Sequence, residues 1–398
     1  MLLKSFLLFF VVITSSFSTP IEDMVTLSYE KNYTLQSLQN AINSANENIA
    51  LSRKWQNPVL TFGANDIQFQ EINKRDTEAM QAQYIGVTQL IPMGDKLEIK
   101  EEVAKKEKQI SEYLLADKKL ELRSKIYELA YTIVIFEKKL QLFDEYLNNI
   151  KQLEDLNVAL YENNQALQTQ ALNAQILYSK ISLQKIKLKN MVDNLYLKLE
   201  NITQEKIEKI DMPLRVDDTE ITFDYQHHPK LQIEKLKVSK ASDMSKFEAE
   251  NKIPDIKFNV AYFQRDDKFQ DYVNVSVGIP LAIYGTENSK VLVAKSKKQE
   301  ALSNYEDLKK SFKTKTQILK NELHTAYATY RLLEQSIIPT KQKVQESLEA
   351  YNALEKVKPQ EVIGNLNELI GFELNALDEL QSYFQAYSQT LYYKDTLK

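Results

Sequence analysis

Residues 89–94, QLIPMG, and residues 277–285, VGIPLAIYG, decide the fold, because each stretch ends a strand-like run and opens a very long helical run. An internal repeat of this size predicts two similar structural units in one chain. A second proline-marked strand start precedes each copy, at Pro58 and Pro254, which lie 254 − 58 = 196 residues apart. The chain is therefore built twice from the same order of elements.

Similar offsets recur at other points of the chain. Pro92 and Pro280 are 188 residues apart, and the breaks that end the two long helical runs, near Tyr161 and Tyr351, are 190 residues apart. A longer loop in the first hairpin explains the difference from the offset of 196. The prediction is a tandem duplication with repeats at about 34–200 and 229–398, joined by a mid-chain linker at 201–228 that forms an equatorial segment.

The N-terminus has the pattern of a secretory signal peptide, with Lys4 before an apolar run at 6–13 and small residues after it. We predict a signal peptide at 1–18, cleavage between Ser18 and Thr19, and a mature chain at 19–398. The apolar run is too short for a good transmembrane helix. The sequence has no cysteine, which excludes disulfides, thiolate metal sites and a lipid-modified cysteine.

Composition narrows the class of protein. The net charge of −4 over 398 residues leaves no basic stripe, which argues against nucleic acid as a partner. No later segment approaches twenty apolar residues, so the sequence is not that of a helical membrane protein. Only seven glycines occur, where average usage predicts roughly 28. So few helix breakers indicate long helices.

Two predicted hairpins, at about 58–91 and 254–280, supply four strands. In the second hairpin, apolar residues from Ile256 to Tyr262 and from Val273 to Ile279 alternate with small or polar ones. The first hairpin, with strands at 59–69 and 79–90, alternates less clearly. Such alternation is typical of a membrane-spanning β-barrel, and a soluble two-layer sheet gives the same pattern.

The helical runs at about 95–161 and 286–351 each have roughly 66 residues and a length of about 100 Å. Such helices do not wrap a compact core. Shorter helices are predicted at about 34–54, with Thr34 as N-cap, and at 169–200, 230–251 and 364–397. They are expected to stack end to end beside the long helices, with Pro339 kinking the second long run.

Four strands cannot close a barrel, and an open edge in lipid leaves unpaired backbone groups that cost several kcal/mol each. A membrane barrel therefore requires oligomerisation. A trimer gives twelve strands, which is wide enough for a channel. The long helices of all subunits then continue the barrel as a helical tube.

These residues resemble the TolC-like outer membrane factors of tripartite efflux and type I secretion systems. The resemblance covers nearly all of the mature chain. It rests on Asn57-Pro58, on the two Ile-Pro stretches, on the HPKL motif at 228–231, on a turn-like stretch at 161–175, and on the duplicated order of elements. No single motif is highly specific, but their order and spacing are.

The resemblance implies a mainly α fold, with a long α-helical barrel and four β-strands per chain. A homotrimer then closes a twelve-stranded β-barrel in the lipid of the Gram-negative outer membrane and extends into the periplasm. Implied partners are a periplasmic adaptor protein and an inner-membrane pump of the resistance-nodulation (RND) or ABC type. The implied function is a passive exit duct without cofactor or enzymatic chemistry.

The family places a gate at its periplasmic turns. Carboxylates often follow the second turn, and here Glu361 fits the first such position while Gly364 occupies the second. Glu361 also has a simple interpretation as an acid in the first turn of a helix. The candidate gate residues are Asn163, Asn164, Gln170, Lys358, Glu361 and Gly364. The candidate junctions between barrel and helices are Pro58, Pro92, Gly94, Pro254, Pro280 and Gly285.

Other chemistry finds little support. His227 and His228 suggest a metal site, but His228 also simply precedes Pro229 at a helix start, and metal sites normally need three or four ligands. No nucleophile elbow, P-loop, zinc-protease or dinucleotide motif occurs. The competing class of protein is a secreted periplasmic scaffold whose hairpins pack on its own helices.

Overall fold

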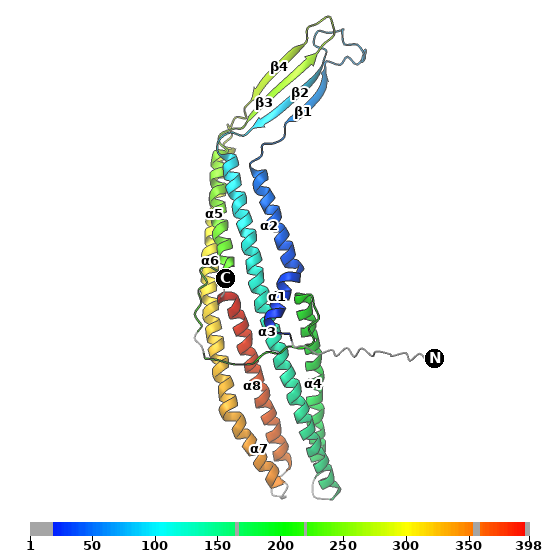
Figure 1. Ribbon diagram of the computed structural model, residues 1–398, viewed down its shortest axis with the longest axis vertical. Helices are drawn as coiled ribbons and strands as arrows, with labels where there is room; N and C mark the ends of the chain where they lie inside the picture. Colours follow the sequence, from blue (N-terminus) through cyan, green and yellow to red (C-terminus); the bar gives the residue numbers. More distant parts are fainter. Residues whose placement is uncertain (1–18, 164–166, 219–220, 353–358, 395–398) are drawn as a thin grey trace, which may run out of the picture. The chain divides into compact units, whose positions relative to one another are not determined.

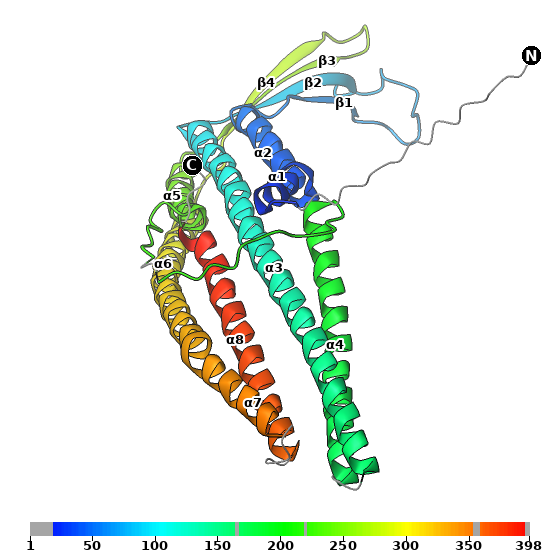
Figure 2. The same ribbon diagram turned by 60° about the horizontal axis from the view of Figure 1, so that its bottom comes forward.

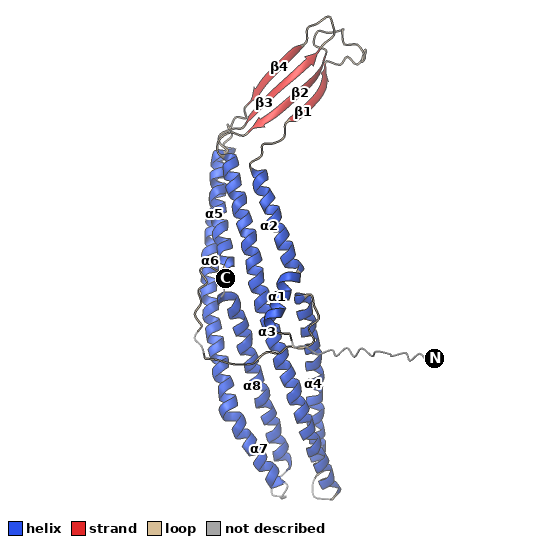
Figure 3. Cartoon of the chain, viewed as in Figure 1, coloured by secondary structure: helices blue, strands red, loops and turns tan. Residues whose placement is uncertain are grey.

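The computed structural model describes residues 19–163, 167–218, 221–352 and 359–394 (Figure 1). The predicted signal peptide at 1–18 lies outside the described residues. Helices dominate, and the strands form a single four-stranded antiparallel sheet (Figure 3). The helices are α1 (Ile21–Lys31), α2 (Tyr33–Ser52), α3 (Lys96–Glu162), α4 (Gln168–Thr203), α5 (Pro229–Glu250), α6 (Thr286–Leu332), α7 (Ile338–Asn352) and α8 (Pro359–Lys394). The predicted fold class, mainly α with four strands, is confirmed.

The chain divides into two compact units. Unit 1 contains the described parts of Met1–Gln36, Asp117–His228 and Phe312–Lys398, and unit 2 contains Ser37–Ala116 and Pro229–Ser311. The helices α3 and α6 contribute residues to both units. Within the described residues, no helix is long and apolar enough to cross a membrane.

The sheet belongs to unit 2 and has the strand order β1-β2-β3-β4. The strands are β1 (Val59–Asn65), β2 (Ala82–Ile91), β3 (Ile256–Gln264) and β4 (Tyr272–Gly278). Strand β2 pairs with β3 from Gln83↔Gln264 to Ile91↔Ile256, which joins the two hairpins into one sheet. The first predicted strand was too long, since β1 ends four residues before residue 69.

The two long helical runs turn out differently. The first is one uninterrupted helix, α3, as predicted. The second is interrupted by a π-helical segment, Leu333–Ile337, between α6 and α7. There the Ile338 N–H bonds to the carbonyl of Leu333, five residues back. The wide turn directly precedes Pro339, which has no N–H to continue an α-helical ladder.

Two helix starts and one whole helix differ from the sequence prediction. The cap of α2 is Asn32, not Thr34, because the Asn32 carboxamide oxygen accepts hydrogen bonds from the N–H groups of Thr34 (3.0 Å) and Leu35 (3.4 Å). Helix α1 was not predicted. Helix α8 begins at Pro359, five residues before the predicted start, with proline at its first position, where no N–H is needed.

The core of unit 1 lies between α3, α4, α6 and α8, joined by α1 and the mid-chain linker. Fully buried side chains include Ile126, Ile133, Leu199 and Leu319. The helices α3 and α8 are antiparallel (Figure 2). Ser124 on α3 donates to the Ser388 carbonyl on α8 at 2.7 Å. Further along α3, Lys139 and Tyr146 bond to Asp378 and Glu373, which come earlier on α8.

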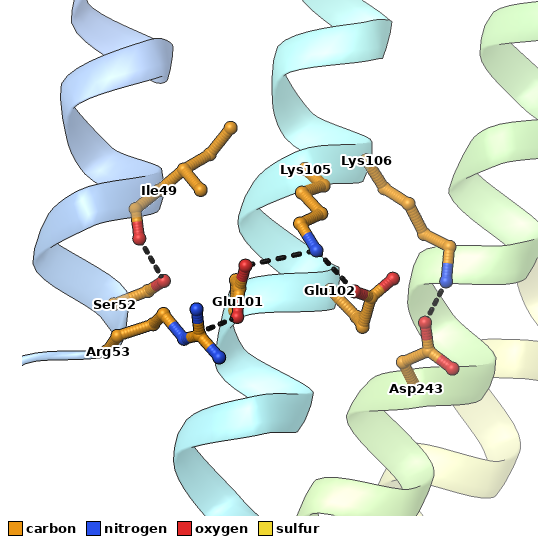
Figure 4. A network of polar contacts seen from close by, with 8 residues as sticks. All are labelled: Ile49, Ser52, Arg53, Glu101, Glu102, Lys105, Lys106 and Asp243. Carbon is orange, nitrogen blue, oxygen red and sulfur yellow. Dashed lines mark hydrogen bonds and ion pairs between the residues drawn. The ribbon is translucent and has the colours of Figure 1, made fainter.

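Charged side chains link the helices of unit 2. Glu101 on α3 accepts from Arg53, which directly follows α2, at 2.7 Å and from Lys105 at 3.0 Å (Figure 4). Asp243 on α5 pairs with Lys106 on α3. Both carboxylates are largely buried, so these ion pairs fix the spacing of α2, α3 and α5.

Candidate functional sites in the sheet and the helical turns

Cross-strand pairing gathers apolar side chains on one face of the sheet, the apolar face. Ile85 pairs with Phe62 and with Tyr262, and Val260 pairs with Val87 and Val275. These residues are between 37% and 69% exposed. The face consists of Leu60, Phe62, Ile85, Val87, Phe258, Val260, Tyr262, Val273, Val275 and Val277. Contiguous exposure of this kind is unusual for a protein surface in water.

The opposite face of the sheet is aromatic at one level and mostly small or polar elsewhere, with Val59 and Leu90 as apolar exceptions near the end of the sheet that leads to the helices. The ring of Phe263 stacks on Tyr84 (centroids 5.0 Å apart) and on Tyr272 (4.8 Å). Asn259 donates to the Thr88 hydroxyl at 2.7 Å. A side chain at Gly63 would approach the Tyr84 ring to 2.5 Å. The structure thus settles which side of the first hairpin is apolar.

Both edges of the sheet are open within the described residues. Strand β1 pairs only with β2 and strand β4 only with β3. An edge strand leaves a row of backbone N–H and C=O groups free to pair with another strand. The sheet therefore carries two different edges, one from each hairpin.

All six candidate junction residues lie in unit 2. The register puts Val59, Ile91, Ile256 and Gly278 at the same end of the sheet. The sequence places Pro58, Pro92, Pro254 and Pro280 one or two residues outside these strand ends. Proline cannot donate to a strand ladder, so the four prolines terminate the strands at this end of the sheet.

Gly94 lies between β2 and α3, and Gly285 lies between β4 and α6. Their φ angles are +71° and +73°, in the left-handed region that favours glycine. At Gly94 a Cβ would also lie 2.8 Å from the Glu250 carboxylate oxygen, whereas Gly285 has open space. Both glycines thus allow the chain to change direction, although their role as junctions of a barrel remains a prediction.

An ion pair links the residue before β3 to the first turn of α3. The Lys96 ammonium, on a side chain only 6% exposed, donates to the Asp255 carboxylate and to the Ile253 carbonyl, both at 2.5 Å. The Met93 N–H donates to the same Asp255 oxygen at 3.1 Å. Burial opposes the charge of Asp255, but these hydrogen bonds lower the pKa of its carboxyl below the usual 3.8.

The candidate gate residues are only partly described. Asn164 and Lys358 lie outside the described residues. Asn163 directly follows α3, and its side-chain amide donates to the Ala159 carbonyl at 2.9 Å. Glu361 is exposed in the first turn of α8, and Gly364 has open space around its Cα. The Gln170 carboxamide oxygen is buried and has no hydrogen-bond partner among the described residues.

Buried amides near both helical turns escaped the sequence analysis. On α8, Asn365 donates to the Gln345 carboxamide oxygen on α7 at 2.8 Å, and both residues are buried. On α3, Asn157 is fully buried, and its carboxamide oxygen has no partner among the described residues. A polar residue on the apolar face of each helix is the signal that would have revealed them.

The structure supports the simple interpretation of His228, which directly precedes Pro229 at the start of α5. His228 is buried, its Nε2 lies 2.9 Å from the Tyr392 carbonyl, and its ring packs edge-on against Phe312. Among the described residues, no group of three or more His, Cys, Asp or Glu is placed to hold a metal ion.

Thr19, at the predicted cleavage site, forms an isolated β-bridge with Ile210, and Ser18 is outside the described residues.

The fold is similar to solved outer membrane proteins over nearly the whole chain. The outer membrane channel CmeC of Campylobacter jejuni is 13% identical with a TM-score of 0.76, covering 94% of this chain and 84% of that chain. A membrane protein from Pseudomonas aeruginosa is 11% identical with a TM-score of 0.81, covering 94% and 92%.

The open state of the MtrE outer membrane channel of Neisseria gonorrhoeae is 12% identical with a TM-score of 0.77, covering 94% and 88% of the two chains. No protein-family model and no curated protein matches the chain. The chain therefore has the fold of outer membrane channels, as its resemblance to the TolC-like factors predicted.

We expect Asp255→Asn to destabilise the protein at pH 7 by about 1–3 kcal/mol, because it weakens a buried charge-assisted contact with Lys96. A carboxylate whose pKa is lowered in the folded state stabilises the fold above its unfolded pKa and loses that effect as pH falls through the folded value. The difference from wild type should therefore shrink below pH 3.8.

Denaturant midpoints measured from pH 7 to pH 2.5 provide the test. Asp267→Asn is the matched control, since Asp267 is exposed and has no hydrogen bond among the described residues. An equal loss for both variants, or a difference independent of pH, would contradict the assigned role of Asp255.

Proposed function

We propose that this chain is one subunit of an outer membrane channel, the exit duct of a tripartite efflux pump or type I secretion system. Three copies close a twelve-stranded barrel in the outer membrane and continue as a helical tube in the periplasm. A periplasmic adaptor and an inner-membrane RND or ABC-type pump deliver the substrate. The duct conducts passively and has no chemistry of its own.

The observation that carries the proposal is the exposed apolar face on all four strands of a sheet with two open edges. In lipid, this face is solvated by acyl chains, whereas free edges are not tolerated. Lateral pairing of β1 of one copy with β4 of the next satisfies the backbone and retains the apolar face outside. The small and polar face then lines the pore.

The competing function, a secreted periplasmic scaffold, requires the hairpins to pack on the chain's own helices. The exposure of the apolar face disfavours that class, because a sheet in water buries one apolar face. The similar solved structures add support, since CmeC and MtrE are outer membrane channels.

The helical turns are the proposed gate, at Asn163, Asn164, Gln170, Lys358, Glu361 and Gly364. Of the carboxylates that family members place after the second turn, only Glu361 is present, so a strongly charged, cation-binding gate is not proposed. We also propose that the chain consists of two tandem repeats, at 34–200 and 229–398, preceded by a signal peptide at 1–18.

Fractionation of cells that produce the full chain tests the function. We expect the protein in the outer membrane fraction as a trimer that dissociates on heating, because a closed barrel joins the three chains. A soluble monomer in the periplasm would sink the proposal and favour the scaffold.

Val275→Asp places a charge on the apolar face and should destabilise the membrane-inserted protein by about 2 kcal/mol if Val275 lies near the bilayer midplane. Ser276→Asp is the matched control on the opposite face, where water is expected. Urea unfolding in lipid vesicles measures both. Normal assembly of Val275→Asp, or equal loss in both variants, would show that the apolar face does not meet lipid.

Gln170→Ala and Glu361→Ala should alter the closed-state leak of the channel without affecting trimer assembly, because both residues lie at the helical turns. Conductance in planar bilayers, with wild-type protein as reference, measures the leak. Unchanged conductance in both variants would remove these residues from the gate.

A further inference from the structure

A groove between α5 and α6 in unit 2 belongs to none of the sites described above. The two helices lie side by side (Figures 1 and 2), and the groove between them has a volume of about 570 Å³. Ligand sites in proteins commonly have volumes of roughly 300–1,000 Å³. The groove is therefore large enough to hold part of a lipid or another small molecule.

The groove runs along the helices away from the sheet. The start of β3, which follows α5, and the end of β4, which precedes α6, lie at the same end of the sheet, so the two helices are antiparallel. On α5 the lining extends from Glu248 back to Lys237, and on α6 it extends from Thr286 forward to Lys297. Each span covers eleven residues, 248 − 237 and 297 − 286, which is about 16 Å of helix. Glu248 and Thr286 thus lie nearest the sheet, and the two lysines lie furthest from it.

The middle of the groove is apolar. Ala241 and Met244 line it from α5, and Val293 and Ala294 line it from α6. Ala294 is buried, whereas Val293 is 55% exposed. Covering such apolar surface with an apolar ligand group is favourable, because it removes the surface from water.

The charged lining of the groove is mainly basic, with four lysines and one glutamate: Lys237, Lys240, Lys290, Lys297 and Glu248. The first two lysines form ion pairs at 2.7 Å with carboxylates outside the lining, Glu234 and Glu107. Lys290 and Lys297 are exposed and have no ion-pair partner among the described residues. Their two positive charges are therefore available to an anion.

Exposed apolar residues continue from the sheet to the start of α6. Val275 and Val277 belong to the apolar face of the sheet. Leu281, Ile283 and Tyr284 follow between β4 and α6, where they are between 70% and 88% exposed. In the proposed channel the apolar face meets lipid, so this segment continues the apolar surface along the chain toward the end of the groove that lies nearest the sheet.

From these features we propose that the groove binds an anionic phospholipid. Its phosphate lies at the basic end, near Lys297, and an acyl chain runs along Val293 and Met244 toward the sheet. Basic pockets between helices are suited to acidic lipid headgroups. A soluble anion would leave the apolar middle uncovered, and a zwitterionic lipid would not match the two lysines that lack a partner. The proposal rests on the outer membrane channel proposed above, because the lipid comes from that membrane.

Titration of the full chain in detergent tests the site. The probes are dioleoyl phosphatidylglycerol, which is anionic, and dioleoyl phosphatidylcholine, which is zwitterionic, and native mass spectrometry counts the bound lipids. We expect tighter binding of the phosphatidylglycerol. Lys290→Gln/Lys297→Gln should weaken that binding by about tenfold or more, because each lysine near an acidic lipid contributes to its affinity.

The matched control is Lys295→Gln/Lys298→Gln, which removes two exposed lysines of α6 that do not line the groove. It should bind the phosphatidylglycerol as wild type does. A photoreactive group on the acyl chain gives the location, since it should cross-link to peptides that contain Met244 or Val293. Equal weakening in both double variants, no preference for the anionic lipid, or cross-links elsewhere would overturn the site.

The remaining outcomes separate this proposal from the one it rests on. Equal affinity for dihexanoyl and dioleoyl phosphatidylglycerol would show that the groove holds an anion without its acyl chain, and would overturn the lipid. An outer membrane trimer that binds both dioleoyl lipids equally overturns the site and leaves the channel standing. A soluble periplasmic monomer overturns both, because no membrane then supplies the lipid.

Discussion

Backbone hydrogen bonding in a medium without water is the constraint on which the remaining structure depends. The sheet presents an exposed apolar face and two open edges, β1 and β4. In water the edges are tolerable and the apolar face is not, whereas in lipid the reverse holds. Both problems are solved together when the edges of different copies pair. The proposed barrel therefore requires several copies of this four-stranded chain.

The remaining elements prepare that assembly. Prolines terminate the four strands at one end of the sheet. Gly94 and Gly285 redirect the chain into helices with φ angles that other residues rarely adopt. The ion pair of Lys96 and Asp255 fixes this end of the sheet to the first turn of α3.

Local patterns in the sequence predicted much of this architecture. The alternation from Ile256 to Tyr262 gave a strand, and the scarcity of glycine gave helices as long as α3. Long-range contacts were harder to predict. Asn32 caps α2 while its amide also donates to the Ile202 carbonyl, 170 residues away, and α1 depends on packing in the core of unit 1. The π-helical segment before Pro339 has no pattern of its own.

The functional sites also divide into those that local sequence patterns predicted and those that depend on long-range contacts. The junction prolines and glycines could be found from the repeated sequence pattern, because their backbone chemistry is distinctive. The gate residues were placed by resemblance, and two of the six lie outside the described residues. The buried amides Asn157, Gln345 and Asn365 were missed because burial decides their significance, and burial depends on the partner helix.

The most direct test of the central claim, that three copies close one barrel, is an image of the particle extracted from the outer membrane in detergent. End-on projections should show a ring with three-fold symmetry and an open centre, at the mass of three chains. A compact particle of one chain, or a ring of different symmetry, would contradict the account.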